Sequence, residues 1–242
     1  MKTALILGSD GGIGFEAAKA LSSQGFNLCL GYQNKESIEK KLLISNIPNY
    51  KLYCIDVTNA ESVNESISKI LETLEIDVVV YSVTPPIINK RIKDLLWEDF
   101  QQHINVQING FYNVINALNP LIQKNHKLKF IVILTEYCLG KPPAMISHYI
   151  TAKYGLMGLV KSMASELSRN NCTFNMISPG MTNTSLLDNL PKKFIEIGAE
   201  NNPMKRIAEP SDIAKIISFL ASDSSDYLNG VNILANGGNI MA

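Results

Sequence analysis

The chain has few cysteines and histidines, and none of them is spaced for a metal site. The four cysteines are scattered along 242 residues: Cys29, Cys54, Cys138 and Cys172. The three histidines are His103, His126 and His148. Without a C-x-x-C pair or a His cluster, the sequence indicates neither a zinc site nor a disulfide framework. We therefore expect no metal, reduced thiols and a cytoplasmic protein.

The chain also lacks an excess of charge of either sign and any long hydrophobic run. Lysine and arginine number 22, as do aspartate and glutamate, and the basic residues form no long cluster. Phosphate contacts need clustered Lys and Arg, so we expect neither nucleic acid nor an anionic membrane as the main partner. The apolar run at positions 3–7 stops at Gly8, too soon for a signal peptide, and no later run could span a bilayer.

What the chain does contain is an alternation of short apolar runs and longer segments with helical periodicity. The runs predict strands at residues 3–7, 27–32, 52–55, 78–82, 130–134, 173–177 and 231–234. The periodic segments predict helices at residues 13–24, 36–44, 60–74, 97–123, 149–169 and 210–221. This alternation predicts one α/β domain over residues 1–242, with a parallel sheet covered by helices on both faces. Residues 178–203 form the longest irregular stretch, where we expect a mobile substrate lid.

A glycine-rich turn links the first predicted strand to the first predicted helix. The turn reads Gly8, Ser9, Asp10, Gly11, Gly12, Ile13 and Gly14. Its glycines allow a close approach of the backbone to a pyrophosphate, and the helix start offers free N–H groups to that anion. The alternative is a plain turn, but the strand before it and the helix after it favour a dinucleotide site in a doubly wound sheet of the Rossmann type.

Tyr149 and Lys153 are four residues apart and therefore share one face of a predicted helix. An ammonium beside a phenol stabilises the phenolate and lowers the pKa of tyrosine from about 10, which makes the phenol a better proton donor. By itself this spacing is more typical of a solvated helix face. The pair lies about 135 residues after the glycine-rich turn, and this combination favours an active site.

Position 32 ends the second predicted strand, where an acidic residue would bind the ribose of an adenosine. The chain has Tyr32 there, followed by Gln33, Asn34 and Lys35. Without a carboxylate at this position, a 2′-phosphate meets no negative charge and Lys35 could pair with it. We therefore expect NADP(H) rather than NAD(H). With no arginine nearby, the alternative for Lys35 is a solvated lysine at the start of a helix.

These residues together resemble the short-chain dehydrogenase/reductase family, and within it the β-ketoacyl carrier-protein reductase branch, over essentially the whole chain. The glycines match its G-x-x-x-G-x-G pattern, and Tyr149 and Lys153 match its Y-x-x-x-K. Matches to its other cofactor contacts are Asp56 and Val57 at the adenine, and Pro179, Gly180 and Thr184 at the nicotinamide amide. Ser82 and Thr182 lie beside the corresponding segments and are included among the expected cofactor-binding residues.

The resemblance implies how the site would work. Tyr149 would protonate a carbonyl oxygen during hydride transfer from the cofactor, while Lys153 would lower the pKa of the phenol and hold the nicotinamide ribose. It further implies a small-molecule or acyl-thioester substrate. It also implies a homotetramer or homodimer whose interface is built on the helices at residues 97–123 and 149–169.

Two positions break the pattern of the family sharply. Where relatives place an asparagine that supports the proton relay, this chain has Gln107, which is one methylene longer. Where relatives place a serine thirteen residues before the tyrosine, it has Glu136. An ionised carboxylate only accepts hydrogen bonds and would repel a carbonyl that gains negative charge. A milder departure is Tyr-Ser-Val-Thr at residues 81–84, where relatives usually carry Asn-Asn-Ala-Gly.

Three roles remain open for Glu136. Burial could raise its pKa so that it donates a proton or hydrogen bond. It could instead bind an amine or hydroxyl of an unusual substrate while Thr135 donates to the reacting oxygen. Thr135 would then have to turn into the site, since neighbours on a strand point to opposite faces. In the third case Glu136 forms a salt bridge with Lys141 and the site is inactive.

The leading prediction is an NAD(P)-dependent oxidoreductase that reduces a carbonyl or oxidises a secondary alcohol. Its predicted catalytic residues are Tyr149, Lys153, Glu136, Gln107 and Thr135. The departures at 107 and 136 favour a substrate other than a plain β-ketoacyl thioester. One alternative is a dinucleotide-binding subunit that no longer turns over and acts as a partner or sensor. The other is a lyase or epimerase that uses Glu136 as an acid or base.

Overall fold

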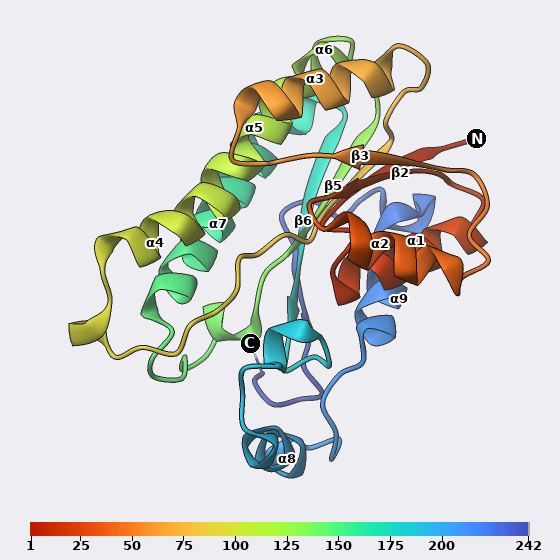
Figure 1. Ribbon diagram of the computed structural model, residues 1–242. Coiled ribbons are helices and arrows are strands. Elements are labelled where there is room, and N and C mark those ends of the chain that lie inside the picture. Colours follow the sequence, from red (N-terminus) through yellow and green to blue (C-terminus); the bar gives the residue numbers. More distant parts are fainter. Residues whose placement is uncertain (242) are drawn as a thin grey trace.

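The computed structural model describes residues 1–241, which are built around one twisted parallel sheet (Figure 1). Its seven strands lie in the order β3-β2-β1-β4-β5-β6-β7. They are β1 (Thr3–Leu7), β2 (Asn27–Tyr32), β3 (Tyr50–Cys54), β4 (Val78–Tyr81), β5 (Leu128–Ile133), β6 (Cys172–Pro179) and β7 (Asn232–Ala235). The strand order reverses beside β1, and ligands of such sheets bind where the carboxyl ends of the strands meet this reversal. The predicted doubly wound Rossmann-type fold is therefore confirmed.

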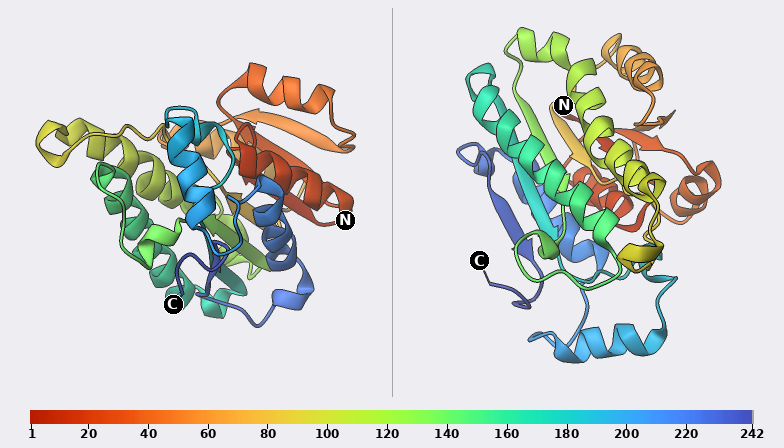
Figure 2. Two further views of the ribbon diagram at one scale, coloured as in Figure 1. Left: turned by 90° about the horizontal axis from the view of Figure 1, so that it is seen from below. Right: turned by 90° about the vertical axis from the view of Figure 1, so that its left-hand side faces the viewer.

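Helices cover both faces of the sheet. They are α1 (Gly12–Ser23), α2 (Lys35–Leu43), α3 (Ala60–Leu71), α4 (Trp97–Ile104), α5 (Gly110–Ala117), α6 (Asn119–Gln123), α7 (Ser147–Glu166), α8 (Lys192–Asn201) and α9 (Pro210–Ala221). Helices α1, α2 and α9 share one apolar cluster with the sheet, while α3, α5 and α7 share the other. The two further views show α4 and α5 running alongside α7 on this second face (Figure 2).

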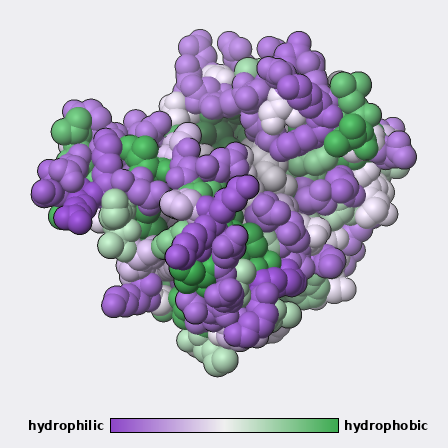
Figure 3. All heavy atoms as spheres, turned by 60° about the horizontal axis from the view of Figure 1, so that its bottom comes forward, coloured by the Kyte–Doolittle hydropathy of each residue, from purple (hydrophilic) through white to green (hydrophobic). Residues whose placement is uncertain are grey.

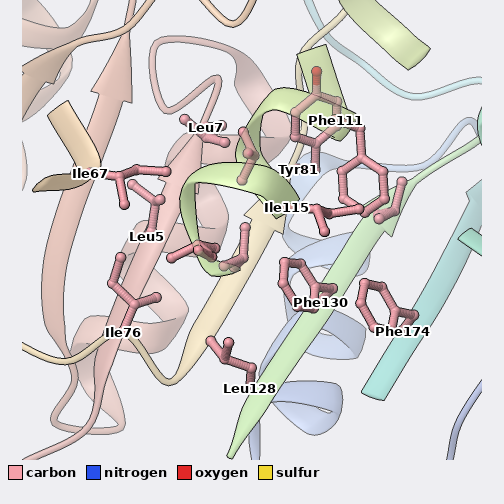
Figure 4. Close-up of a cluster of buried hydrophobic side chains, with 14 of the residues drawn as sticks. Leu5, Leu7, Ile67, Ile76, Tyr81, Phe111, Ile115, Leu128, Phe130 and Phe174 are labelled. Carbon is pink, nitrogen blue, oxygen red and sulfur yellow. The ribbon is translucent and has the colours of Figure 1, made fainter. Parts of the chain in front are cut away.

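The sheet is the centre of the core because its middle strands are buried on both faces. Every residue of β1, β4 and β5 is buried, which explains why these strands read as continuous apolar runs. Aromatic side chains fill the space beneath α5 (Figure 4). The rings of Phe130 and Phe174 stack with their centroids 4.3 Å apart, and Phe111 meets Phe130 edge-on at 6.2 Å. This rigid layer fixes the strand ends that carry the site.

The helix predicted at residues 97–123 is interrupted twice. A π-helical turn at Asn105–Asn109 separates α4 from α5, and the chain breaks again at Leu118 before Pro120 near the start of α6. Proline has no N–H for an internal helical bond, so a new helix begins there. The π turn has no such signal in the sequence, because its φ and ψ angles stay helical and only the hydrogen-bond partner changes.

The stretch predicted to be irregular, residues 178–203, contains helix α8. This helix has no buried residue, and its large apolar side chains Phe194 and Ile197 are 51% and 43% exposed. Seen from the side where α8 lies, the surface is mostly hydrophilic with patches of hydrophobic residues between (Figure 3).

The structure also shows what kinds of site and segment the described residues contain. Within residues 1–241, no helix is both long and apolar enough to cross a membrane. In the same residues, no group of three or more His, Cys, Asp or Glu side chains is arranged to hold a metal ion. All four cysteines are free, and only Cys54 is exposed.

Candidate active site

The glycine-rich turn lies between β1 and α1, as the sequence predicts. Gly8 has a φ of +81°, and a Cβ added there would lie 2.6 Å from the backbone oxygen of Ser82. A Cβ on Gly14 would overlap the carbonyl oxygen of Gly8. The Ser9 hydroxyl donates to the carbonyl oxygen of Gly31 at 2.9 Å and so fastens the turn to β2. No side chain caps α1, which leaves its first N–H groups for an anion.

A cleft of about 1020 Å³ opens beside this turn at the carboxyl edge of the sheet. Ten of the predicted cofactor residues line it: Gly8, Asp10, Gly12, Ile13, Tyr32, Lys35, Asp56, Val57, Ser82 and Thr184. Six others lie outside its lining: Ser9, Gly14, Lys153, Pro179, Gly180 and Thr182. Ser9 and Gly14 are buried behind the turn, and Pro179 ends β6. The cleft thus runs from the end of β2 past the turn toward Thr184, as an extended dinucleotide would require.

At the β2 end of the cleft, the side chain of Asp10 from the glycine-rich turn reaches the backbone just before α2. Its carboxylate accepts hydrogen bonds from the backbone N–H groups of Asn34 at 2.8 Å and Gln33 at 3.3 Å. Lys35 is largely exposed, and its Nζ lies 3.7 Å from Glu39 Oε1. The negative side chain next to Lys35, the residue expected to bind a 2′-phosphate, is therefore Glu39, and the sequence did not indicate that Asp10 binds the backbone where α2 begins. Local spacing gives no sign of it, because the contact spans 24 residues.

Tyr149 and Lys153 lie one turn apart on α7, and both are buried. Lys153 Nζ donates to the carbonyl oxygen of Ile133 at 2.7 Å and lies 5.9 Å from the centroid of the tyrosine ring. Burial lowers the pKa of Lys153 from 10.5 to about 7. Burial also raises the pKa of Tyr149, and a hydrogen bond from the side chain of Thr135 opposes that rise. The phenol therefore keeps its proton at neutral pH, and the lowering of its pKa by Lys153 that the sequence predicts is not found.

The side chains of Thr135 and Glu136, which follow the end of β5, point to different parts of the molecule. Thr135 has extended backbone angles and lies beside the phenol of Tyr149, while Glu136 begins a short 3₁₀ turn that carries its side chain elsewhere. The Glu136 carboxylate accepts from Asn236 Nδ2 at 3.1 Å and from Asn239 Nδ2 at 3.1 Å. Of the three roles left open for Glu136, the salt bridge with Lys141 is not formed, since these two asparagines hold the carboxylate instead. Burial raises the pKa of Glu136, and both amides counteract it.

Gln107 lies in the π-helical turn and is fully buried. Its Nε2 donates to Thr84 Oγ1 at 2.7 Å, and Thr84 lines the cleft. Its Oε1 has no hydrogen-bond partner within residues 1–241, so this acceptor remains free. Asn105, the first residue of the same π turn, lines the cleft.

Two buried histidines adjoin Tyr149 and were not foreseen. The rings of His103 and His148 meet at 4.7 Å, and His103 lies 5.9 Å from the ring of Tyr149. Burial lowers the pKa of both, that of His103 to about 4, so the pair is neutral at pH 7. Neutral rings let the histidines pack as part of the wall behind the tyrosine.

These features define a class of protein: a dinucleotide-binding oxidoreductase with a cofactor cleft at the glycine-rich turn and a buried tyrosine and lysine on α7. The sequence model of the family described as enoyl-(acyl carrier protein) reductase matches residues 8–239. The chain therefore belongs to this family, within the short-chain dehydrogenases/reductases. The resemblance to that family is confirmed, and the chain is an NAD(P)-dependent oxidoreductase of the ketoreductase-like kind.

Individual relatives agree over the full length. The 3-oxoacyl-[acyl-carrier-protein] reductase FabG of Staphylococcus epidermidis is 28% identical over 249 residues, covering 99% of each chain. The FabG of Rickettsia typhi is 30% identical over 243 residues, covering 99% of this chain and 97% of its own. Neither alternative reading, a subunit without turnover or a lyase, is favoured by these comparisons.

Solved structures show the same fold. A short-chain type dehydrogenase/reductase from Mycobacterium marinum has a TM-score of 0.92 at 24% identity, covering 100% of this chain and 96% of its own. The structure titled ElxO with NADP bound has a TM-score of 0.89 at 27% identity, covering 98% of both chains. The first comparison supports only the fold. The second shows that the chain is similar to a protein whose structure contains NADP.

Proposed function

We propose that this protein reduces the β-keto group of an acyl thioester with NADPH. The observation that carries the proposal is the buried pair on α7, in which Lys153 Nζ lies 5.9 Å from the centroid of the Tyr149 ring and donates to the carbonyl oxygen of Ile133 at the end of β5. Glu136 turns toward two asparagines and leaves the reacting oxygen without a neighbouring carboxylate. The sequence-based reason for expecting a different substrate at this position therefore loses its force. The full-length similarity to FabG proteins supports the same substrate class.

The residues of the cleft fit a dinucleotide. Side chains at Gly8 and Gly14 would fill the cradle beside α1, where a pyrophosphate would approach the backbone. Asp56 and Val57 would hold the adenine, Tyr32 and Lys35 the adenosine ribose with its phosphate, and Thr184 the nicotinamide end. When bound, the cofactor supplies the hydride. The similarity to a protein that holds NADP supports NADPH over NADH, with Asp10 as the opposing charge.

Each side chain of the site has a distinct task in this proposal. Tyr149 gives its phenolic proton to the oxygen of the reduced carbonyl, and Thr135 donates a hydrogen bond to the same oxygen. Lys153, once protonated, stabilises the phenolate left behind. Gln107 offers its free Oε1 as an acceptor for a water that returns the proton. Burial of the tyrosine and lysine strengthens these electrostatic effects, because a low local dielectric screens them less.

Three wider features belong to the same proposal. Residues 178–203, with α8, form a mobile lid over the substrate. The protein assembles as a homotetramer or homodimer through α4, α5 and α7, where Tyr112 and Tyr154 are 54% and 42% exposed. It acts in the cytoplasm, where thiols stay reduced. Light scattering at micromolar concentration tests the assembly, and a monomer would contradict it.

The test of function is NADPH consumption with a short β-ketoacyl thioester. We expect turnover by the wild type and a loss of at least about a hundredfold in Tyr149→Phe, the order that general acid catalysis contributes. NADH in a parallel assay decides the cofactor. If the wild type binds NADPH but reduces no β-ketoacyl thioester, the substrate class is wrong. Failure to bind either dinucleotide would remove the proposal altogether.

A further inference from the structure

The carboxylate of Glu136 is buried in a cluster of amides far away in the sequence. The residue is 2% exposed. Its Oε2 accepts from Asn236 Nδ2 at 3.1 Å, and both carboxylate oxygens accept from Asn239 Nδ2, at 3.2 and 3.1 Å. Hydrogen bonds to an ionised acceptor are about twice as strong as neutral ones. Glu136 therefore ties the end of β5 firmly to the segment 236–240.

Asn236 links Glu136 to the segment that follows α8. Its side chain holds the local turn, because Nδ2 donates to the carbonyl oxygen of Ile240 at 2.9 Å and Oδ1 accepts from the N–H of Gly238 at 3.1 Å. Its own carbonyl oxygen accepts from Asn202 Nδ2 at 2.8 Å. Asn202 directly follows α8, and its Oδ1 caps the N–H of Met204 at 2.9 Å. A continuous chain of hydrogen bonds thus joins Glu136 to the carboxyl end of α8.

The residues around these hydrogen bonds are closely packed, so the hydrogen-bonded side chains have little room to move. A Cβ on Gly180 would lie 3.1 Å from Asn236 Cα and 3.4 Å from Glu136 Oε1. A Cβ on Gly140 would overlap the side chain of Ile240. The loop after β5, the segment after β6 and the segment 236–240 are therefore held against one another at Glu136, next to Thr135.

We propose that Glu136 is a positioning residue, which sets the place of α8 through Asn236 and Asn202, without touching the substrate itself. The inference rests on the proposed function only where α8 is taken as the substrate lid. Glu136 occupies the position at which relatives carry a serine. In this protein Thr135 donates the hydrogen bond to the substrate oxygen, and Glu136 holds α8 in place. Substrate binding then depends on Glu136, and hydride transfer chemistry does not.

Hydrogen exchange of the α8 amides tests this without any substrate. Glu136→Gln turns an amide N–H₂ toward the donors of the asparagines and loses one charge-assisted hydrogen bond. We expect exchange in residues 192–202 to rise about tenfold, as for loss of one such bond. Asn239→Asp sets two carboxylates face to face and should raise it at least as much. The double variant restores an amide–carboxylate pair in reverse and should return to within about threefold of the wild type. Glu166→Gln, an exposed carboxylate on α7, is the control.

Kinetics separate positioning from direct catalysis. In Glu136→Gln we expect KM for the thioester to rise about tenfold while kcat and the affinity for NADPH change less than about twofold, and the double variant should recover KM. Unchanged exchange of α8 in both single variants, or a double variant without rescue, would overturn the proposal. So would a loss of kcat in Glu136→Gln with wild-type exchange. A wild type that binds no NADPH would remove the proposed function, while the exchange experiment would still decide the role of Glu136.

Discussion

Replacing Lys153 with methionine should stabilise the protein at neutral pH while it removes activity. Lys153 is 3% exposed, and its pKa in the folded protein falls from 10.5 to about 7. At 1.36 kcal/mol for each pKa unit, burial of the charged form costs about 5 kcal/mol. Methionine loses the hydrogen bond to Ile133, which offsets about 1 kcal/mol. We therefore expect Lys153→Met to gain about 4 kcal/mol in the free energy of unfolding at pH 7.

The pH dependence gives this prediction its sign. Between pH 7 and 10.5 the unfolded chain carries a proton on Lys153 that the folded protein has released, so the folded wild type gains stability as the pH rises. The destabilisation caused by burying the Lys153 ammonium is fully present below pH 7 and absent above pH 10.5. The advantage of Lys153→Met should consequently shrink by about 2 kcal/mol from pH 7 to pH 9.

Urea unfolding of both proteins at these two pH values measures the effect. The comparison of two variants cancels the titration of other groups, since Lys153→Met leaves them in place. An advantage of Lys153→Met that is equal at both pH values, or larger at pH 9, would refute a depressed lysine pKa. The ammonium would then be stabilised in the folded protein, and the view that the site stores an unfavourable charge would fail.

Three further variants test other parts of the site. Tyr149→Phe should lose at least about a hundredfold in turnover and keep NADPH affinity within about twofold by fluorescence titration, since only the proton is removed. Asp10→Asn should tighten NADPH binding about tenfold and leave NADH binding unchanged, because a negative charge leaves the start of α2. Gly14→Ala should abolish dinucleotide binding and lower the melting temperature, since its Cβ would overlap the oxygen of Gly8.

The fold could be predicted because its signals are local. Buried parallel strands such as Val78–Tyr81 are continuous apolar runs, and amphipathic helices such as Ala60–Leu71 repeat their apolar residues every three or four positions. The glycine-rich turn and the pair Tyr149 and Lys153 are likewise short motifs. Helix α8 was not predicted, and it buries no face against the core.

The roles of Glu136 and Asp10 could not be predicted, because their partners lie far away in the sequence. Asn236 and Asn239 follow Glu136 by 100 and 103 residues, and nothing near position 136 indicates them. Strand alternation alone places Thr135 and Glu136 on opposite sides but does not say which side faces the tyrosine. The 3₁₀ turn that begins at Glu136 decides this, and it depends on tertiary contacts.

The two departures at positions 84 and 107 explain each other. Relatives carry glycine and asparagine there, whereas this chain carries Thr84 and Gln107, and the longer amide donates to the added hydroxyl at 2.7 Å. Glycine at position 84 would leave Gln107 Nε2 buried without a partner, which costs about 1–3 kcal/mol. Glu136 is matched in the same way by two asparagines. Each of these substituted side chains makes at least one hydrogen bond, while Gln107 Oε1 and the ring nitrogens of His103 and His148 are buried without a partner within residues 1–241. We therefore interpret the departures as a rearranged hydrogen-bond pattern at the proposed active site, in which Gln107 Oε1 has no partner within residues 1–241.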